Sequence, residues 1–169
     1  MTTAVLLGLM LAFEPGEADV MSYPPRKPDS PILSGILITR ILLVSVLMLS
    51  AAFSIFTWQK SIGYPVEVAR TVAVNLFVMI ELTYLFNCRS LTRSMFKIGL
   101  FTNPWVLVGS GAMIVLQLLF TYAPVMNRVF HSAPISLTDW LLIALIAVAV
   151  YLIIGLEKWV RLHVLKNPR

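Results

Sequence analysis

One glutamate stands inside an apolar stretch that is long enough to lie in a membrane. The stretch VNLFVMIELTYLF runs from Val74 to Phe86, and Glu81 has apolar residues on both sides. An ionisable side chain at membrane depth costs at least about 2.5 kcal/mol, so it usually faces other helices or water and serves a function. Hard cations favour carboxylate and carbonyl oxygens as ligands. Glu81, together with Asn75, is therefore a candidate ligand for a cation, or a carrier of a proton.

The helical positions of the surrounding polar residues favour this interpretation. At about 100° per residue, an arc of roughly 140° holds five polar residues, namely Glu67, Arg70, Thr71, Asn75 and Glu81. One side of the helix is thus polar along most of its length. A structural alternative stays open, in which Glu81 is protonated, or hydrogen-bonded to a neighbouring helix, and only holds the helices together.

The composition indicates that this stretch lies in a membrane. Of the 169 residues, 59% are hydrophobic and 12% are charged, whereas soluble domains have about 45–50% and about 25%. A span needs roughly 20 apolar residues, and four stretches qualify: Ile32–Trp58, Val66–Phe86, Pro104–Tyr122 and Trp140–Leu156. Residues 1–13 are apolar but too short, and we expect them to be the end of a truncated transmembrane helix. The sequence predicts an all-α integral membrane protein, a bundle of four full transmembrane helices (residues 32–156) plus an N-terminal partial helix.

The basic residues predict how this multi-pass protein is oriented. If the chain crosses at each span, nine Lys and Arg fall on one side and two, or three with Arg70, fall on the other. Cytoplasmic loops carry the excess of Lys and Arg, so we expect the Pro-rich connector 14–31, the loop 87–103 and the basic tail 157–169 in the cytoplasm. We expect the plasma (inner) membrane and the lipid bilayer as surroundings. No basic stripe interleaved with aromatic residues suggests nucleic acid.

Three local patterns give further expectations. Arg40 lies in the first full span, and we expect its long side chain to snorkel to the headgroups, with a pairing to Glu81 as the alternative. Residues 125–139 are expected to form an external loop. Thr138 or Asp139 is expected to cap the last helix.

A long run of motifs gives the chain a family resemblance. The connector contains Phe13-Glu14-Pro15, Asp19-Val20-Met21, Pro24-Pro25-Arg26-Lys27-Pro28 and Pro31; further pieces are RTVAVN (70–75), FNCRS (86–90), NPW (103–105) and LTDW (137–140). Together they resemble the C-terminal transmembrane domain of P-type cation-transporting ATPases of the calcium-pump type. The resemblance covers the chain from late in the sixth membrane helix through the tenth.

This resemblance implies site residues and partners. Glu81 falls where calcium pumps carry an ion ligand in the eighth helix. Thr3 matches the threonine of the sixth-helix N-x-x-T-D motif, and Ala4 stands in the place of its aspartate. The resemblance therefore implies a transported cation, Ca²⁺ or another, with doubt cast on calcium because one carboxylate is missing. It also implies that the remaining helices and cytoplasmic domains of a full-length pump are partners.

The phosphorylation chemistry of such pumps is not expected in this chain. They phosphorylate the Asp of a D-K-T-G motif, and none of Asp19, Asp29 and Asp139 is followed by Lys. ATP and Mg²⁺ are thus expected only in the full-length pump. The leading prediction is the C-terminal membrane domain of an ATP-driven cation pump that is not catalytic alone. The alternatives are a stand-alone scaffold or regulatory subunit derived from such a pump, and a carrier that uses Glu81 as a relay.

Overall fold

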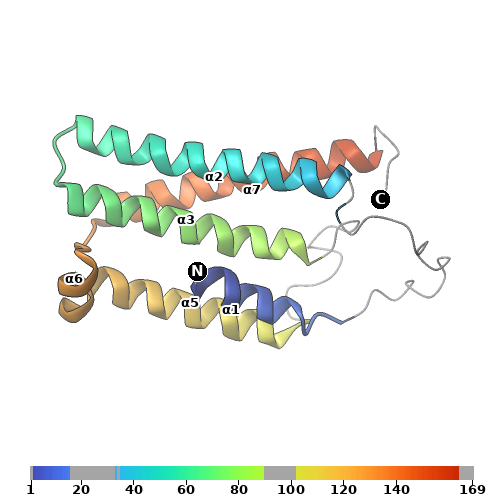
Figure 1. Cartoon of the computed structure of the whole chain (residues 1–169), viewed down its shortest axis with the longest axis horizontal. Helices are drawn as coiled ribbons and strands as arrows, with labels where there is room; N and C mark the ends of the chain where they lie inside the picture. The colour runs from blue at the N-terminus through green and yellow to red at the C-terminus, as the bar shows by residue number, and fades with distance from the viewer. Residues whose placement is uncertain (1, 16–32, 34, 90–101, 164–169) are drawn as a thin grey trace.

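The long helices of the protein lie side by side along one common axis (Figure 1). The computed structural model describes residues 2–15, 33, 35–89 and 102–163, and every regular element in these ranges is an α-helix. Four of them are long and apolar enough to cross a membrane, as the sequence predicts. The helices are α1 (Thr2–Leu11), α2 (Gly35–Ser61), α3 (Val66–Cys88), α5 (Pro104–Tyr122), α6 (Pro124–Phe130) and α7 (Leu137–His163), drawn in Figure 1.

The two ends of this bundle differ in which helices begin and end there. At one end, here the connector end, α1, α3 and α7 finish while α2 and α5 begin (Figure 1). At the other, the turn end, α2 passes into α3, and α5 reaches α7 by way of α6. Most of the 14–31 connector and most of the 87–103 loop lie outside the described residues.

The α2–α3 turn shows why these two spans are antiparallel neighbours. Gly63 has a φ of +91°, a left-handed conformation that glycine adopts without steric cost. The Gly63 N–H donates to the Lys60 carbonyl and the Tyr64 N–H to the Gln59 carbonyl, at 3.2 and 3.1 Å. This pair of bonds is a Schellman motif, and it ends α2 sharply enough for α3 to start at Val66.

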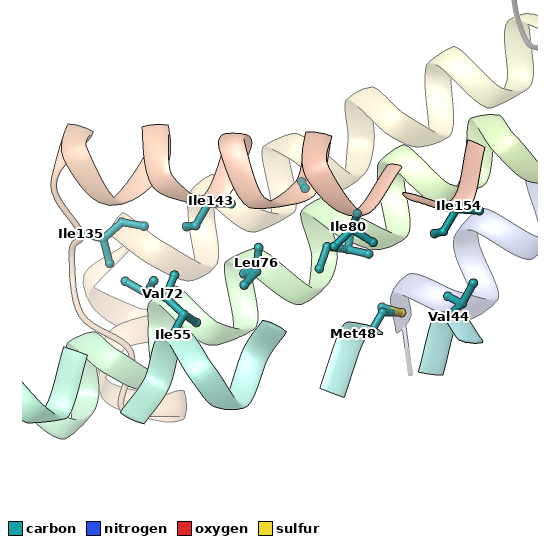
Figure 2. Close-up of a cluster of buried hydrophobic side chains, with 11 residues drawn as sticks. Val44, Met48, Ile55, Val72, Leu76, Ile80, Ile135, Ile143 and Ile154 are labelled. Atoms are coloured by element: carbon teal, nitrogen blue, oxygen red, sulfur yellow. The ribbon is translucent and has the colours of Figure 1, made fainter. Parts of the chain in front are cut away.

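Helix α3 is the centre of the bundle. It contacts α1, α2, α5 and α7, and half of its apolar window is buried, against 17–28% in the other three candidate spans. One apolar cluster fills the space between α2, α3 and α7 (Figure 2) and includes Val44, Val72, Leu76, Ile80 and Ile143. A second cluster joins α3 to α1 and α5 through residues that include Leu7, Val78, Leu82, Leu85 and Val106. The helix that carries Glu81 is therefore covered on two sides.

The turn end differs from the sequence prediction in two ways. The expected loop 125–139 contains the short helix α6. The cap of α7 is Ser136, not Thr138 or Asp139: the Ser136 hydroxyl accepts from the Asp139 N–H at 3.2 Å. The Asp139 carboxylate in turn accepts from the Ser136 N–H at 2.9 Å. This reciprocal pair is a capping box, with the acidic residue three positions after the cap.

Helix α7 also extends beyond its predicted limits. It starts at Leu137 and continues to His163, so the first seven residues of the predicted basic tail are helical. Lys158 and Arg161 are buried there, whereas a solvated tail would leave them exposed.

The central position of α3 leads to a stability prediction. Leu76 is fully buried in the first cluster, whereas Leu49 on α2 is 69% exposed. Truncating a packed leucine leaves a cavity, so Leu76→Ala should lower the unfolding free energy of the purified protein in detergent by about 2–3 kcal/mol. Leu49→Ala, the matched control, should change it by less than about 0.5 kcal/mol. Equal effects in a denaturant titration would contradict the central packing of α3.

Candidate cation site on the central helix

The polar side of α3 makes different contacts along its length. Near the turn end, Arg70 donates to the His131 carbonyl, and the Thr71 hydroxyl accepts from the Ala133 N–H at 2.9 Å. These bonds attach the segment between α6 and α7 to α3. The outer part of the predicted polar arc is thus structural, because its side chains satisfy backbone groups of a non-helical segment.

Asn75 lies one turn deeper and joins α3 to α5. Its side chain is 1% exposed, and its Nδ2 donates to the Thr121 hydroxyl at 3.0 Å and to the Thr71 carbonyl at 2.9 Å. A threonine hydroxyl has one proton to donate. The Thr121 hydroxyl oxygen lies 2.8 Å from the Gln117 carbonyl oxygen but 3.4 Å from Asn75 Oδ1. The Asn75 side-chain carbonyl therefore keeps most of its capacity as an acceptor.

Glu81 lies closer to the connector end and is half-buried. Its Oε2 atom is buried and has no hydrogen-bond partner within the part of the chain that the structure describes. A buried carboxylate oxygen without a donor, proton or cation is strongly unfavourable. Of the predicted polar arc, Glu81 is thus the residue whose chemistry the described neighbours leave incomplete.

Thr3 lies on α1, which packs against α3 and α5, and its side chain is half-buried. Thr3 is eight residues before the end of α1, and Glu81 is seven residues before the end of α3. At about 1.5 Å per residue, they lie about 12 and about 10 Å from ends that meet at the same side of the bundle. The two side chains therefore belong to one level of the bundle, whereas Asn75 is about 9 Å further along α3.

Neither a cluster of metal-binding side chains nor the cavity next to Asn75 marks the position of Glu81 among the described residues. Among the described residues, no group of three His, Cys, Asp or Glu could hold a metal ion. A cavity of about 260 Å³ lies between α3, α5 and α7. Its lining includes Asn75 and Gln117 but not Glu81, so Glu81 is not part of that cavity.

Arg40 is the clearest correction to the sequence prediction. Its side chain is 2% exposed, so it does not snorkel to the headgroups. Its Nη2 donates to Asn87 Oδ1 at 3.1 Å, and its Nε lies 3.8 Å from Glu157 Oε2. In the described ranges its partners are thus on α3 and α7, and the alternative pairing with Glu81 is wrong as well.

Sequence reasoning missed Asn87 and Glu157 as partners of a buried charge. The buried residues of α2 are Arg40, Val44, Met48, Ile55 and Gln59, and their spacing of mostly four residues is that of one helix face. This stripe places Arg40 toward the bundle, but the sequence does not distinguish it, because most of the other residues of α2 are apolar as well. The identity of the partners depends on how α3 and α7 pack.

The family model for the C-terminus of cation transporting ATPases matches residues 1–160. The chain belongs to this family. It is 48% identical over 157 residues to the "Probable cation-transporting ATPase F" of Mycobacterium tuberculosis, covering 93% of this chain and 17% of that protein.

Two further relatives are described as calcium-transporting. The chain is 30% identical over 151 residues to the "Calcium-transporting ATPase 1" of Schizosaccharomyces pombe, covering 89% of this chain and 17% of that protein. It is 31% identical over 150 residues to the mouse "Calcium-transporting ATPase type 2C member 2", covering 88% and 16%. The chain thus spans about a sixth of the length of these relatives.

The buried Arg40 cluster leads to a second stability prediction. Arg40→Gln leaves Glu157 without its interhelical partner, and removing one member of a buried pair costs about 3–5 kcal/mol. Glu157 is 23% exposed, so we expect a loss of about 2 kcal/mol in the unfolding free energy, after allowance for solvent screening. The stability of Arg40→Lys should lie between those of the unchanged protein and Arg40→Gln. A lysine ammonium keeps the charge but lacks the planar guanidinium that contacts both Asn87 and Glu157. Lys60→Gln, which removes an exposed charge from the same helix, is the control; an Arg40→Gln protein as stable as this control would contradict the buried pairing.

Proposed function

We propose that the chain forms the C-terminal membrane part of an ATP-driven cation pump, in which Glu81 is a ligand of the transported cation. The single observation that carries the Glu81 assignment is its buried and unpartnered Oε2 atom. Membership of the cation transporting ATPase family supports the transport role. A bound cation would supply the partner that this carboxylate oxygen lacks.

Helix α1 supplies a further candidate oxygen in this proposal. Thr3 is at the depth of Glu81 on a helix that packs against α3, and its hydroxyl and main-chain carbonyl are suitable oxygen ligands for a hard cation. Helix α1 contains no carboxylate. The site therefore gains one negative charge from the described residues, and helices elsewhere in the pump would supply the rest.

Asn75 has a supporting role in this proposal. It lies nearer the turn end than Glu81, and its Oδ1 is only weakly engaged by Thr121. Two ligands of one cation are separated by about 5 Å at most, and Asn75 is about 9 Å from Glu81 along the helix. We therefore assign Asn75 to a position along the pathway between Glu81 and the turn end.

The orientation of the pump follows from its charges. Nine Lys and Arg belong to the connector-end segments and two, or three with Arg70, to the turn end, so the connector end would face the cytoplasm. ATP, Mg²⁺ and the phosphorylated aspartate would then belong to other parts of the pump on that side. Phosphorylation there would change the packing of the helices and expose Glu81 to the two sides in turn.

A pair of glutamates on one helix tests the ligand role. In the full-length pump, Glu81→Gln removes the charge at the proposed site, whereas Glu67→Gln removes an exposed carboxylate at the start of α3. Loss of one charged ligand is worth at least about 1.4 kcal/mol, which is tenfold in a binding constant. We expect Glu81→Gln to raise the half-saturating cation concentration of ATPase activity at least tenfold, across a series of Ca²⁺, Mn²⁺, Na⁺ and K⁺. If the ATPase activity of Glu81→Gln had the same cation dependence as that of Glu67→Gln, the ligand role of Glu81 would be refuted.

Cysteine labelling tests the orientation independently. Lys60 and Arg128 are exposed at the turn end, so single cysteines at these positions should react with a membrane-impermeant maleimide on intact cells, with Cys88 replaced by serine. A cysteine at Arg169 in the basic tail should react only after the membrane is permeabilised. The reverse pattern would mean that the connector end faces outward.

A further inference from the structure

Four polar residues meet at the connector end, and we refer to them as the helix-end cluster: Glu14, Arg89, Thr102 and Asn103. Glu14 Oε1 accepts from Arg89 Nε at 2.9 Å and from Arg89 Nη2 at 2.8 Å. Glu14 Oε2 accepts from Asn103 Nδ2 at 2.8 Å, and Arg89 also donates to the Thr102 hydroxyl. Both carboxylate oxygens of Glu14 are thus held, each by a different chain segment.

Each member of this cluster stands at the end of a helix. Glu14 follows α1, and its N–H still donates to the Leu11 carbonyl at 3.0 Å. Arg89 is the C-cap of α3, and Asn103 is the N-cap of α5, where its Oδ1 accepts from the N–H groups of Trp105 and Val106. The cluster therefore links the ends of three helices that no short turn connects.

The burial of the cluster makes these bonds stronger than a surface ion pair. The Arg89 side chain is 0% exposed and that of Glu14 is 15% exposed. Charge-assisted bonds with two arginine nitrogens on a carboxylate fix geometry as well as energy. The buried guanidinium of Arg89 therefore holds the Glu14 carboxylate in one position.

Most of the other described contacts of α1 are apolar. Leu7 is buried in the second apolar cluster, with Leu6, Met10 and Leu11 packed against it, and van der Waals packing of this kind helps helices associate in lipid. A Cβ atom at Gly109 on α5 would lie 3.5 Å from the Met10 Cβ. The described polar contacts of α1 with other elements concentrate at its connector end, where Asn103 Nδ2 also donates to the Met10 carbonyl at 3.4 Å.

From these observations we infer that the helix-end cluster sets the axial register of α1 against α3 and α5, and so holds Thr3 at the depth of Glu81. The second part of this inference rests on the proposed cation site. A slip of one helical turn would move Thr3 by about 5.4 Å, which is more than twice a cation–oxygen distance. Arg89, Glu14 and Asn103 are then positioning residues for cation binding, although none of them touches the cation.

A disulfide between α1 and α5 reports this register directly. The Cβ–Cβ distance of 3.5 Å between Met10 and a side chain at position 109 lies within the range of disulfides. In a full-length pump whose other cysteines are serine, the pair Met10→Cys/Gly109→Cys should therefore cross-link rapidly with a mild oxidant. Arg89→Gln should slow this cross-link about tenfold, and the exposed control Lys60→Gln should leave its rate unchanged.

A second measurement follows cation affinity in the same variants without the engineered cysteines. Arg89→Gln should raise the half-saturating cation concentration about three- to tenfold, with less than a twofold change in kcat at saturating cation. Arg89→Lys should recover part of the affinity, because its ammonium still reaches Glu14 through one bond. If Arg89→Gln does not fold, Glu14→Gln tests the same contact more mildly, since its amide oxygen still accepts from Arg89.

The two measurements separate the inference from the proposed function. An unchanged cross-linking rate in Arg89→Gln and Glu14→Gln would overturn the inference, because the register would not depend on the cluster. A slower cross-link with an unchanged half-saturating concentration would overturn its link to cation binding. If Glu81→Gln were also silent, the proposed cation site would fail while the register role stood. A slower cross-link together with weaker cation binding would support both.

Discussion

The membrane-buried surface of α3 carries polar side chains that must find their partners on other elements. A helix in lipid satisfies its own backbone, but its side-chain amides and hydroxyls need donors or acceptors that lipid does not offer. In α3, Thr71 binds the segment before α7, Asn75 binds Thr121 of α5, and Asn87 binds Arg40 of α2. These three bonds add fixed polar contacts from α3 to α5, to α2 and to the segment before α7, beside the apolar packing of the spans. Glu81 is different because no described neighbour completes it.

The spans themselves were predictable because a bilayer fixes the length of an apolar helix, and α5 matches its predicted limits at both ends. Helix α6 was missed because seven residues after a proline give too short a pattern to recognise. The cap of α7 was misplaced because Ser136, Thr138 and Asp139 are all of the cap-forming type, and only the reciprocal bonds distinguish them. The prediction for Arg40 was wrong because a long side chain near a helix end can reach either the headgroups or neighbouring helices. Tertiary packing determines which of the two it contacts.

The candidate site was only partly readable from the sequence. Glu81 stands out because it is an acidic residue deep in an apolar span, and Thr3 entered only through the family resemblance. The partner of Asn75 was beyond reach, since Thr121 is 46 residues away and faces it only when α5 packs in this register. The helix-end cluster was missed for the same reason. In the sequence Arg89 counts as one more orienting charge, and only the assembled ends of α1, α3 and α5 give it partners.

The pairing of Arg40 also bears on how the protein is made. Asn87 and Glu157 follow Arg40 in the chain by 47 and 117 residues, so ribosomes working at about 5–20 residues per second reach Glu157 roughly ten seconds later. During that interval α2 must enter the bilayer with an uncompensated cation near its end, where the arginine is still free to extend to the headgroups. The other residues of α2 are mostly apolar, and apolar residues favour insertion. The buried contacts of Arg40 therefore depend on residues that are made after α2, first Asn87 of α3 and then Glu157 of α7.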